Sequence, residues 1–486
     1  MTPTWDELTA ELQRSDLLVR VEGAPGPLSG ITSDSRSVRP GNVYVAVRGS
    51  QADGHAFVPD AVARGAAAIV VESLQQAGVP ELLVRDGRRA AVALAGAWHD
   101  HPARRLRLVG ITGTNGKTTT AALLRHLLNE GGTAGSIGTI GAVDGSGQPV
   151  ASTAGTLTTP GPVDLQATLA ALVARGVTDV AMEASSHSLD QGRLDGLTFA
   201  AGVFTNLTRD HLDYHGSMDA YLVAKLRLAG LLGVQGIQVV SADDSAWRAL
   251  APAAQRITFG LHPDADLRAC DVQLDARGSR FAITGRFGAA SVELPILGDF
   301  NVSNALAAAA CAIGLGHSLG DVVTRLASAP QVPGRMERLA DRPCVVLRDY
   351  AHTPDALERS LRTLRPLTAG RLVLVFGCGG DRDKGKRPLM GQVAGQLADL
   401  AIVTSDNPRT EDPEAILDQI EEGMAGAPHL RIVDRLEAIA RALADAGPAA
   451  TILLAGKGHE TYQIVGTERR PFDEREIVQQ LVSGKR

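Results

Sequence analysis

Cysteine is scarce in this chain, which has four among 486 residues. They are far apart and form no C-x-x-C pair, so we expect neither a disulfide framework nor a zinc knuckle. This pattern fits a reducing compartment and predicts a cytoplasmic protein. The cysteines are Cys270, Cys311, Cys344 and Cys378.

An excess of positive charge and long apolar runs are also lacking. The chain has 54 acidic and 48 basic side chains, a formal net charge of -6, so it has no basic excess to neutralise a nucleic-acid backbone. No apolar run approaches the roughly 18 residues of a membrane span, and the acidic start MTPTWDELTAEL does not resemble a targeting segment. We therefore expect no nucleic-acid partner and no membrane insertion.

The apolar residues that are present form short runs, among them NVYVAV, LRLVGIT, RLVLVFG and ATILLAGKG. Most runs end in small or polar residues and precede a segment of helical period, which predicts parallel α/β sheets. At roughly 150 residues per domain the length suggests about three domains. The polar HPARR and the Pro-Gly pair of QVPGRME divide the chain into residues 1–104, 105–333 and 334–486.

A phosphate loop is predicted by LRLVGITGTNGKTTTAALLRHLLNEGG, which has the pattern strand, Gly-rich turn, helix. Gly113 and Gly116 would let backbone N–H groups turn toward phosphate oxygens, and Lys117 adds a full positive charge. Thr118 would hold magnesium. The strict G-x-x-x-x-G-K-[ST] pattern fails because Ile111 stands at the first glycine position. The loop predicts ATP or GTP handling but not the reaction, and a chance Gly-rich turn is the alternative.

Further motifs follow in order: TLTTPGPVDLQ, MEASSHSLDQGRL, TNLTRDHLDYHG, DYAHTPDAL, GCGGDRDKGKRP, TSDNPR and AGKGHETYQIV. With GTNGKTTT and the earlier TSDSRSVRPGNVYVAVRGSQADGHAF, they resemble the Mur ligase family over nearly the whole chain. The resemblance implies an N-terminal UDP-binding domain, a central phosphate-loop ATPase domain and a C-terminal Rossmann-like domain that binds the amino acid.

Within that family, the pattern is similar to members that add the third amino acid, and DNPR resembles the meso-diaminopimelate type. The resemblance implies ATP-dependent ligation in peptidoglycan precursor synthesis. ATP would convert the D-glutamate carboxylate of UDP-N-acetylmuramoyl-L-alanyl-D-glutamate into an acyl phosphate. The amine of meso-diaminopimelate would then displace phosphate, and the protein's work would be positioning and charge neutralisation.

The resemblance also implies catalytic and metal-binding roles. Read without it, His211 is a structural hydrogen bonder and Lys225 a surface lysine. The matching lysine is carbamylated in the family, which needs a neutral amine, and burial would favour that form. The implied catalytic residues are Lys117, Glu183, His211 and Lys225, and the implied magnesium ligands are Thr118, Glu183, His211 and Lys225 as N6-carboxylysine.

Substrate contacts are implied in the same way. Some of the implied ATP contacts lie in the third domain, so ATP would bind at a domain junction. Closure of that domain would exclude water from the site. The ATP contacts would be Gly113, Thr114, Asn115, Gly116, Lys117, Thr118, Thr119, Asn301, Asn304, Arg335, Asp349 and His352. The contacts to the UDP-muramoyl peptide would be Ser33, Ser35, Ser50, Gln51, Ala52, Thr158, Thr159, Ser185, Gln191 and Arg193. The family often has Asn where this chain has Leu157, which removes one hydrogen bond.

The incoming amino acid would lie on the C-terminal domain, where an arginine fork takes its distal carboxylate and Glu460 takes its ammonium. The implied contacts are Arg382, Asp406, Asn407, Pro408, Arg409, Gly456 and Glu460. The nearest alternative is the same ligation with L-lysine or L-ornithine. Weaker alternatives are a folylpolyglutamate-type ligase and a phosphate-loop ATPase without ligase chemistry. We expect a monomer.

Overall fold

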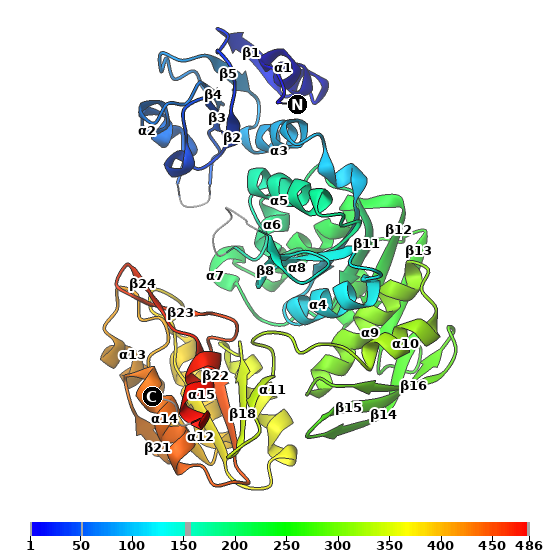
Figure 1. Ribbon diagram of the computed structural model, residues 1–486, viewed down its shortest axis with the longest axis vertical. Coiled ribbons are helices and arrows are strands. Elements are labelled where there is room, and N and C mark those ends of the chain that lie inside the picture. The colour runs from blue at the N-terminus through cyan, green and yellow to red at the C-terminus, as the bar shows by residue number, and fades with distance from the viewer. Residues whose placement is uncertain (1, 50–51, 151–156, 484–486) are drawn as a thin grey trace. The chain divides into compact units, whose positions relative to one another are not determined.

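The computed structural model describes residues 2–49, 52–150 and 157–483 and is an α/β protein (Figure 1). Its strands form sheets of five, eleven and six strands and a two-stranded hairpin. The three larger sheets span residues 18–84, 107–294 and 337–455, so each segment expected from the sequence holds one sheet. The boundaries at residues 104 and 333 stay predictions. By its packing the chain divides into two compact units, residues 1–268 with 306–322 and residues 269–305 with 323–486.

The first sheet has the strand order β1-β5-β4-β3-β2, with β1 antiparallel to β5 and the other pairs parallel. Strands β3 and β4 are buried throughout, which explains why their apolar runs are continuous rather than alternating. Helices α1 and α3 pack on one face and α2 on the other. The elements are β1 (Leu18–Glu22), β2 (Gly30–Thr32), β3 (Asn42–Val45), β4 (Ala68–Val71), β5 (Glu81–Val84), α1 (Trp5–Arg14), α2 (Val58–Ala63) and α3 (Gly87–Trp98).

The second sheet has the order β16-β15-β14-β13-β12-β11-β6-β10-β7-β8-β9. Its centre, from β12 to β7, is parallel. The strands are β6 (Arg107–Thr112), β7 (Ala134–Gly138), β8 (Gly141–Val143), β9 (Pro149–Val150), β10 (Asp179–Glu183), β11 (Phe199–Phe204), β12 (Leu232–Ser241), β13 (Gln255–Gly260), β14 (Leu267–Asp275), β15 (Gly278–Gly285) and β16 (Ala290–Leu294).

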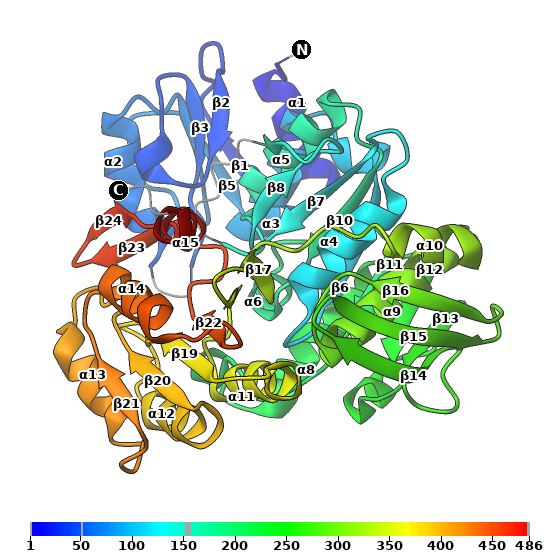
Figure 2. The same cartoon turned by 60° about the horizontal axis from the view of Figure 1, so that its bottom comes forward.

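Seven helices accompany this sheet among the described residues. Helix α4 follows the phosphate loop and packs along β7 and β10 (Figure 2). The Ala-rich run NVSNALAAAACAIGLG, expected as a buried helix, lies almost entirely in α9. The helices are α4 (Lys117–Leu128), α5 (Pro162–Ala174), α6 (Ser186–Asp190), α7 (Leu212–His215), α8 (Met218–Leu226), α9 (Asp299–Gly314) and α10 (Leu319–Leu326).

The third sheet has the order β17-β18-β22-β19-β20-β21 and is parallel except for the edge strand β17. Helices α11, α12 and α13 pack on one face and α14 and α15 on the other. The strands are β17 (Glu337–Ala340), β18 (Val345–Asp349), β19 (Leu372–Phe376), β20 (Leu400–Val403), β21 (His429–Arg431), β22 (Thr451–Ala455), and the hairpin β23 (Tyr462–Val465) and β24 (Glu468–Pro471). The helices are α11 (Pro354–Leu364), α12 (Lys386–Leu397), α13 (Pro413–Glu421), α14 (Arg435–Asp445) and α15 (Glu474–Ser483).

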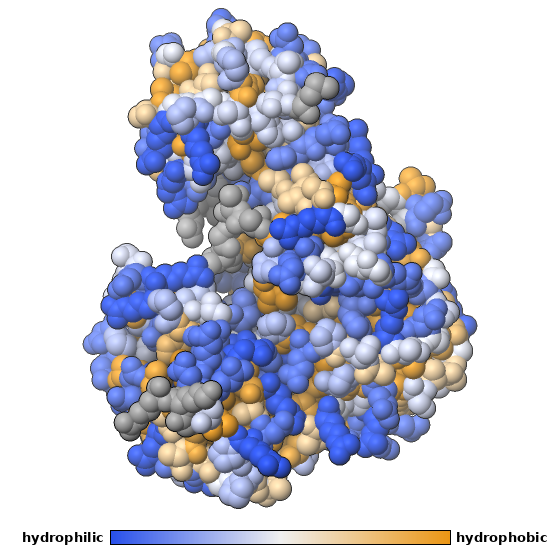
Figure 3. Space-filling model, in the orientation of Figure 1, coloured by the Kyte–Doolittle hydropathy of each residue, from blue (hydrophilic) through white to orange (hydrophobic). Residues whose placement is uncertain are grey.

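The surface that Figure 3 shows is mainly hydrophilic, with hydrophobic residues scattered over it. The most exposed large hydrophobic side chains, Val234 and Val223, come from separate elements, β12 and α8. Scattered exposed residues of this kind are ordinary on a globular protein. Among the helices that the structure describes, none is both long and apolar enough to cross a membrane.

Candidate active site

The sequence motifs follow the carboxyl ends of neighbouring parallel strands. In the second sheet, β10 ends at Glu183 beside Ile111 of β6. Strand β11 ends at Phe204 beside Thr112 of β6. The phosphate loop and the two motifs after β10 and β11 therefore leave the sheet at one edge, which is where parallel α/β sheets bind ligands.

Two glycines give the phosphate loop its shape. Gly113 and Gly116 have φ of +149° and +85°, which side-chain-bearing residues rarely adopt. Gly113 also lies directly against the loop after β11, because a Cβ there would overlap Thr205 Oγ1. Both positions therefore require glycine for backbone conformation, and Gly113 requires it for space as well.

The loop after β11 holds the phosphate loop by several hydrogen bonds. The N–H groups of Thr114 and Asn115 donate to the backbone and side-chain oxygens of Asn206, at 2.7 and 2.9 Å. The N–H of Thr208 donates to Thr114 Oγ1 at 2.9 Å. These contacts join residues about ninety positions apart in the chain and tie the phosphate loop to the loop after β11.

Two lysine amines share one carbonyl oxygen of the loop. Lys117 Nζ donates to Gly113 O at 3.0 Å, and Lys225 Nζ donates to the same oxygen at 2.8 Å. Lys225 is 1% exposed and lies over the ring of Tyr221, 4.3 Å from its centroid. Burial, and then the charge of Lys117, hold the pKa of Lys225 well below its ordinary value. The residue is thus buried and disposed to be neutral, unlike a surface lysine.

Glu183 is also buried, and its carboxylate has a defined orientation. Its two oxygens accept hydrogen bonds from the backbone N–H and the hydroxyl of Thr139, at 2.8 and 3.0 Å. Gly138 makes the close approach possible, because a Cβ there would overlap the carboxylate. Thr139 was not identified from the sequence, because it lies 44 residues from Glu183 in the chain.

Histidine and tyrosine rings cluster around His211, whose backbone is left-handed with φ of +53°. The ring of His187 lies 4.8 Å from that of His211 and 4.3 Å from that of Tyr214. Burial, and then the neighbouring His211 and His215, lower the pKa of His187 to about 4. Of these rings only His211 was identified from the sequence. The sequence does give a signal for Tyr214 and His215, because their spacing of i+3 and i+4 from His211 places the three rings on one face of a helix.

The predicted muramoyl-peptide contacts of this unit form one hydrogen-bonded group beside Glu183. Thr159 Oγ1 donates to Glu183 O at 2.7 Å, and Ser185 N donates to that hydroxyl at 3.2 Å. Arg193 donates to Thr159 O at 3.0 Å and twice to Gln191 Oε1. Thr158 adds its hydroxyl, which accepts from Thr139 at 3.3 Å. Leu157, which replaces the common Asn, is 48% exposed.

The N-terminal contacts are described only in part. Ser33 is half-buried and Ser35 buried, in a turn where the Asp34 carboxylate accepts from the N–H of Arg36. Ala52 is exposed. Ser50 and Gln51 lie outside the described residues.

Within residues 2–49, 52–150 and 157–483, no group of three or more His, Cys, Asp or Glu side chains is placed to hold a metal ion by itself. Magnesium is usually held by one or two carboxylates together with substrate phosphates and water. Thr118 and Glu183 supply hard oxygen ligands of the required kind.

In the other unit, the loops after β18, β19, β20 and β22 carry the DYAH, GCGG, DNPR and GKGHE motifs. In the sheet these strands are neighbours in the order β18, β22, β19, β20, and all are parallel. Four motifs that are widely separated in sequence therefore leave the third sheet at the same edge.

Asp349 and its neighbours form the first of these loops. Its carboxylate accepts from Met336 N at 2.7 Å and from Ser360 Oγ at 3.2 Å. Burial raises its pKa, although the nearby charge of Arg335 opposes the shift. The Arg335 guanidinium lies over the Tyr350 ring at 4.7 Å, and His352 Nδ1 donates to Tyr350 O at 2.7 Å.

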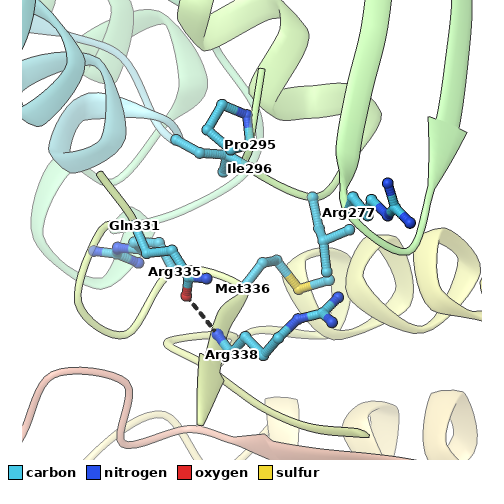
Figure 4. Close-up of a pocket in the computed structure, with 8 residues that line it drawn as sticks. Arg277, Pro295, Ile296, Gln331, Arg335, Met336 and Arg338 are labelled. Carbon is cyan, nitrogen blue, oxygen red and sulfur yellow. Dashed lines mark hydrogen bonds between the residues drawn. The ribbon is translucent and has the colours of Figure 1, made fainter. Parts of the chain in front are cut away.

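Asn301 and Asn304 lie at the start of α9 and bond to each other. Asn304 Nδ2 donates to Asn301 Oδ1 at 2.9 Å, and Asn301 Nδ2 donates to Leu297 O at 2.6 Å. A pocket lined by Arg335, Met336 and Arg338 lies nearby (Figure 4). At about 20 Å³ it has room for roughly one water molecule, so it is not a nucleotide pocket.

The DNPR segment is packed between two Gly-rich loops. A Cβ on Gly380 would overlap Pro408 O, and one on Gly377 would overlap Thr404 O. On the other side Gly456, with φ of +109°, lies against Asp406. The guanidinium of Arg409 donates to Gly380 O at 2.7 Å. The glycines of GCGG are therefore explained by the close approach of their loop to DNPR, whereas Gly456 of AGKG is explained by its backbone conformation.

Asp406, Asn407 and Glu460 are brought together by these loops. Asn407 Nδ2 donates to Glu460 Oε2 at 2.8 Å. Lys457 Nζ lies 3.2 Å from Asp406 Oδ1 and is fully buried. Lys457 was not identified from the sequence, although it stands next to Gly456. Arg382 is exposed on the loop after β19.

Comparison with protein families gives three matches in succession along the chain. The family described as "Mur ligase family, catalytic domain" matches residues 27–99, "Mur ligase middle domain" matches residues 111–312, and "Mur ligase, glutamate ligase domain" matches residues 334–458. Each match covers most of one of the three larger sheets.

Individual proteins are similar over the whole length. A relative from Alkalilimnicola ehrlichii, named UDP-N-acetylmuramoyl-L-alanyl-D-glutamate--2,6-diaminopimelate ligase, is 44% identical over an alignment of 478 residues. The alignment covers 94% of this chain and 95% of the relative. A solved structure of an enzyme with the same name is 33% identical, with a TM-score of 0.67 over 100% of this chain and 99% of that one. MurF ligase from Thermotoga maritima in complex with ADP shares the fold, with a TM-score of 0.66 at 20% identity over 94% and 97% of the two chains.

Proposed function

The chain belongs to the Mur ligase family, and from this premise we propose that it joins meso-diaminopimelate to the D-glutamate of UDP-N-acetylmuramoyl-L-alanyl-D-glutamate. It is an ATP-dependent amide-bond-forming ligase of peptidoglycan synthesis. The observation that carries this function is the 44% identity to a diaminopimelate ligase over 94% of the chain. The hydrogen bonds of Asn407 and Arg409, which hold the DNPR segment in place, support the same substrate.

The phosphate loop would hold the ATP phosphates, with loop N–H groups and Lys117 as donors. The D-glutamate carboxylate attacks the γ-phosphate and gives an acyl phosphate and ADP. The diaminopimelate amine then attacks the acyl carbon, loses a proton and expels phosphate. Arg193 and its hydroxyl neighbours would orient the muramoyl peptide, and positioning of this kind supplies most of the rate.

Magnesium would be held by Thr118, Glu183, His211 and a carbamate on Lys225. Bound there it would neutralise charge on the transferring phosphate. Carbamylation of Lys225 is supported by its burial and by a pKa well below the ordinary value, because only a neutral amine reacts with carbon dioxide. Glu183 is supported as a ligand by its fixed orientation on Thr139.

Arg409 and Arg382 would take the distal carboxylate of diaminopimelate, and Glu460 its ammonium. We also propose a cytoplasmic monomer. The cysteines among the described residues are not paired in disulfides, which fits a reducing compartment. Size-exclusion chromatography with light scattering tests the monomer.

Phosphate release from the purified protein tests the function. The assay contains ATP, magnesium and the UDP-muramoyl dipeptide, with meso-diaminopimelate, L-lysine or L-ornithine in parallel. We expect release, and a product of matching mass, with diaminopimelate. Release with lysine or ornithine instead would show that one of these is the amino-acid substrate. Phosphate release that is independent of any amino acid would overturn the ligase function.

A further inference from the structure

Lys457 is a fully buried lysine in the loop after β22, at the centre of the DNPR loops. Its amine faces three oxygen acceptors. They are Asp406 Oδ1 at 3.2 Å, Asn407 Oδ1 at 3.2 Å and Glu460 Oε2 at 3.5 Å. A buried ammonium persists only where such partners compensate its lost hydration. The three acceptors provide that compensation and form a hydrogen-bonded network around Lys457.

Asn407 has one orientation in this network because all of its side-chain contacts agree. Its Oδ1 accepts from Lys457 and from the N–H of Ile464, the latter at 2.9 Å. Its Nδ2 donates to Glu460 Oε2 at 2.8 Å. A flipped amide would face the lysine and the N–H with its donor group, so Lys457 and the N–H of Ile464 together determine which group of Asn407 meets Glu460.

The contacts to Glu460 all fall on one of its oxygens. Lys457 and Asn407 both reach Oε2, while Oε1 receives no hydrogen bond from any residue that the structure describes. The side chain retains 15% of its exposure. The carboxylate is therefore held by one oxygen and offers the other to an incoming donor.

The charges of Lys457, Asp406 and Glu460 do not balance, because one ammonium faces two carboxylates. Burial alone would raise the pKa of Asp406, but Lys457 and Arg435 outweigh it and hold the pKa below the ordinary value. Lys457 and Asp406 then form a buried pair whose charges cancel. Lys457 also lies 3.5 Å from Glu460, so one ammonium faces two carboxylates and this cluster beside the DNPR segment carries a net negative charge.

We propose that Lys457 is a positioning residue that directs Glu460 Oε1 toward the second ammonium of the amino-acid substrate, and so sets selectivity for a diamino acid. This inference rests on the proposed function. It assigns Lys457 no contact with the reacting atoms. Its effect is on which amino acid is accepted and not on ATP.

The test compares meso-diaminopimelate with 2-aminopimelate, which keeps the distal carboxylate but lacks the second amine. In the wild-type enzyme we expect kcat/KM to favour diaminopimelate by roughly 30-fold or more, because one charged hydrogen bond is at stake. Lys457→Met should reduce that ratio to within about threefold, while the KM for ATP stays within about twofold.

Three further variants separate positioning from folding. Lys457→Met with Asp406→Asn removes both charges of the buried pair, so it should fold more stably than the single variant and still lack selectivity. Glu460→Gln should lose the same selectivity, and adding Lys457→Met to it should change the ratio no further. Additive losses in that pair would overturn the inference.

Arg348→Met is the matched control, because Arg348 is another buried cation of this unit, paired with Glu337 and Asp473. It should lower the unfolding temperature and leave the selectivity ratio unchanged. If Lys457→Met behaves like this control, Lys457 is structural and the inference is wrong. If the wild-type enzyme ligates neither amino acid, the proposed function fails instead, and that result is read from the wild type alone.

Discussion

At the scale of single residues, two lysine amines meet at the phosphate loop. The amines of Lys117 and Lys225 donate to the same carbonyl oxygen. Burial lowers the pKa of Lys225 in the folded protein, whereas the unfolded chain titrates near its ordinary value of about 10.4. Between the two values, unfolding takes up a proton. The folded state therefore loses stability as the pH falls below about 10.4.

Lys225→Met should accordingly raise the unfolding temperature near pH 7 while it removes ligation. The stability difference from the wild type should shrink as the pH rises toward 10, because the wild-type penalty disappears there. Calorimetry in buffers depleted of carbon dioxide measures this without carbamylation. We expect activity to fall by more than about 100-fold, since the variant cannot form the carbamate. A variant with near-normal ligation would contradict the role of Lys225.

Gly113 is a residue whose replacement should affect nucleotide binding directly. A Cβ at this position overlaps Thr205 Oγ1, and φ of +149° disfavours any side chain. Gly113→Ala should cost about 2–3 kcal/mol of stability and raise the KM for ATP more than about tenfold. Gly230→Ala is the control, because a Cβ there meets open space. Equal effects of the two substitutions on the KM for ATP would show that the phosphate loop tolerates displacement.

At the scale of elements, selectivity depends on loops that leave adjacent strands rather than on one helix or strand. The loop after β19 contacts the DNPR segment after β20 through Gly380, where a Cβ would overlap Pro408 O. Displacement of DNPR by that overlap would move Arg409, which bonds to Gly380 O. Misplacement of a binding group by about 1 Å can cost about 100-fold.

Gly380→Ala should therefore raise the KM for diaminopimelate by about 10- to 100-fold and leave the KM for ATP within about twofold. Steady-state kinetics with each substrate varied in turn measures both values. Gly447→Ala, in the same unit, adds a Cβ that contacts nothing within 4 Å and should change neither. A parallel rise in both KM values would indicate general unfolding of the unit rather than a local shift of DNPR.

At the scale of the whole molecule, the elements were largely predictable and the contacts between them were not. Continuous apolar runs predicted β3, β6, β19 and β22, because strands buried on both faces lack alternation. The Ala-rich run predicted α9. Motif order predicted the family. By contrast, nothing near Lys225 in the sequence indicates that it reaches Gly113, 112 residues away. The pairing of Lys457 with Asp406, 51 residues apart, is equally invisible.

Magnesium and nucleotide should stabilise this molecule only together. Magnesium in sites of this kind is usually held by one or two carboxylates, and substrate phosphates and water complete its coordination. The magnesium–ADP complex, at about 100 times its dissociation constant, should add about 2.7 kcal/mol of stability. EDTA should remove most of that gain. Magnesium alone should leave the unfolding temperature unchanged in a thermal scan, and Lys117→Met should abolish the response to the pair. A rise with magnesium alone would mean that the protein holds the ion before nucleotide binds, and the coordination would then have to come from protein groups alone.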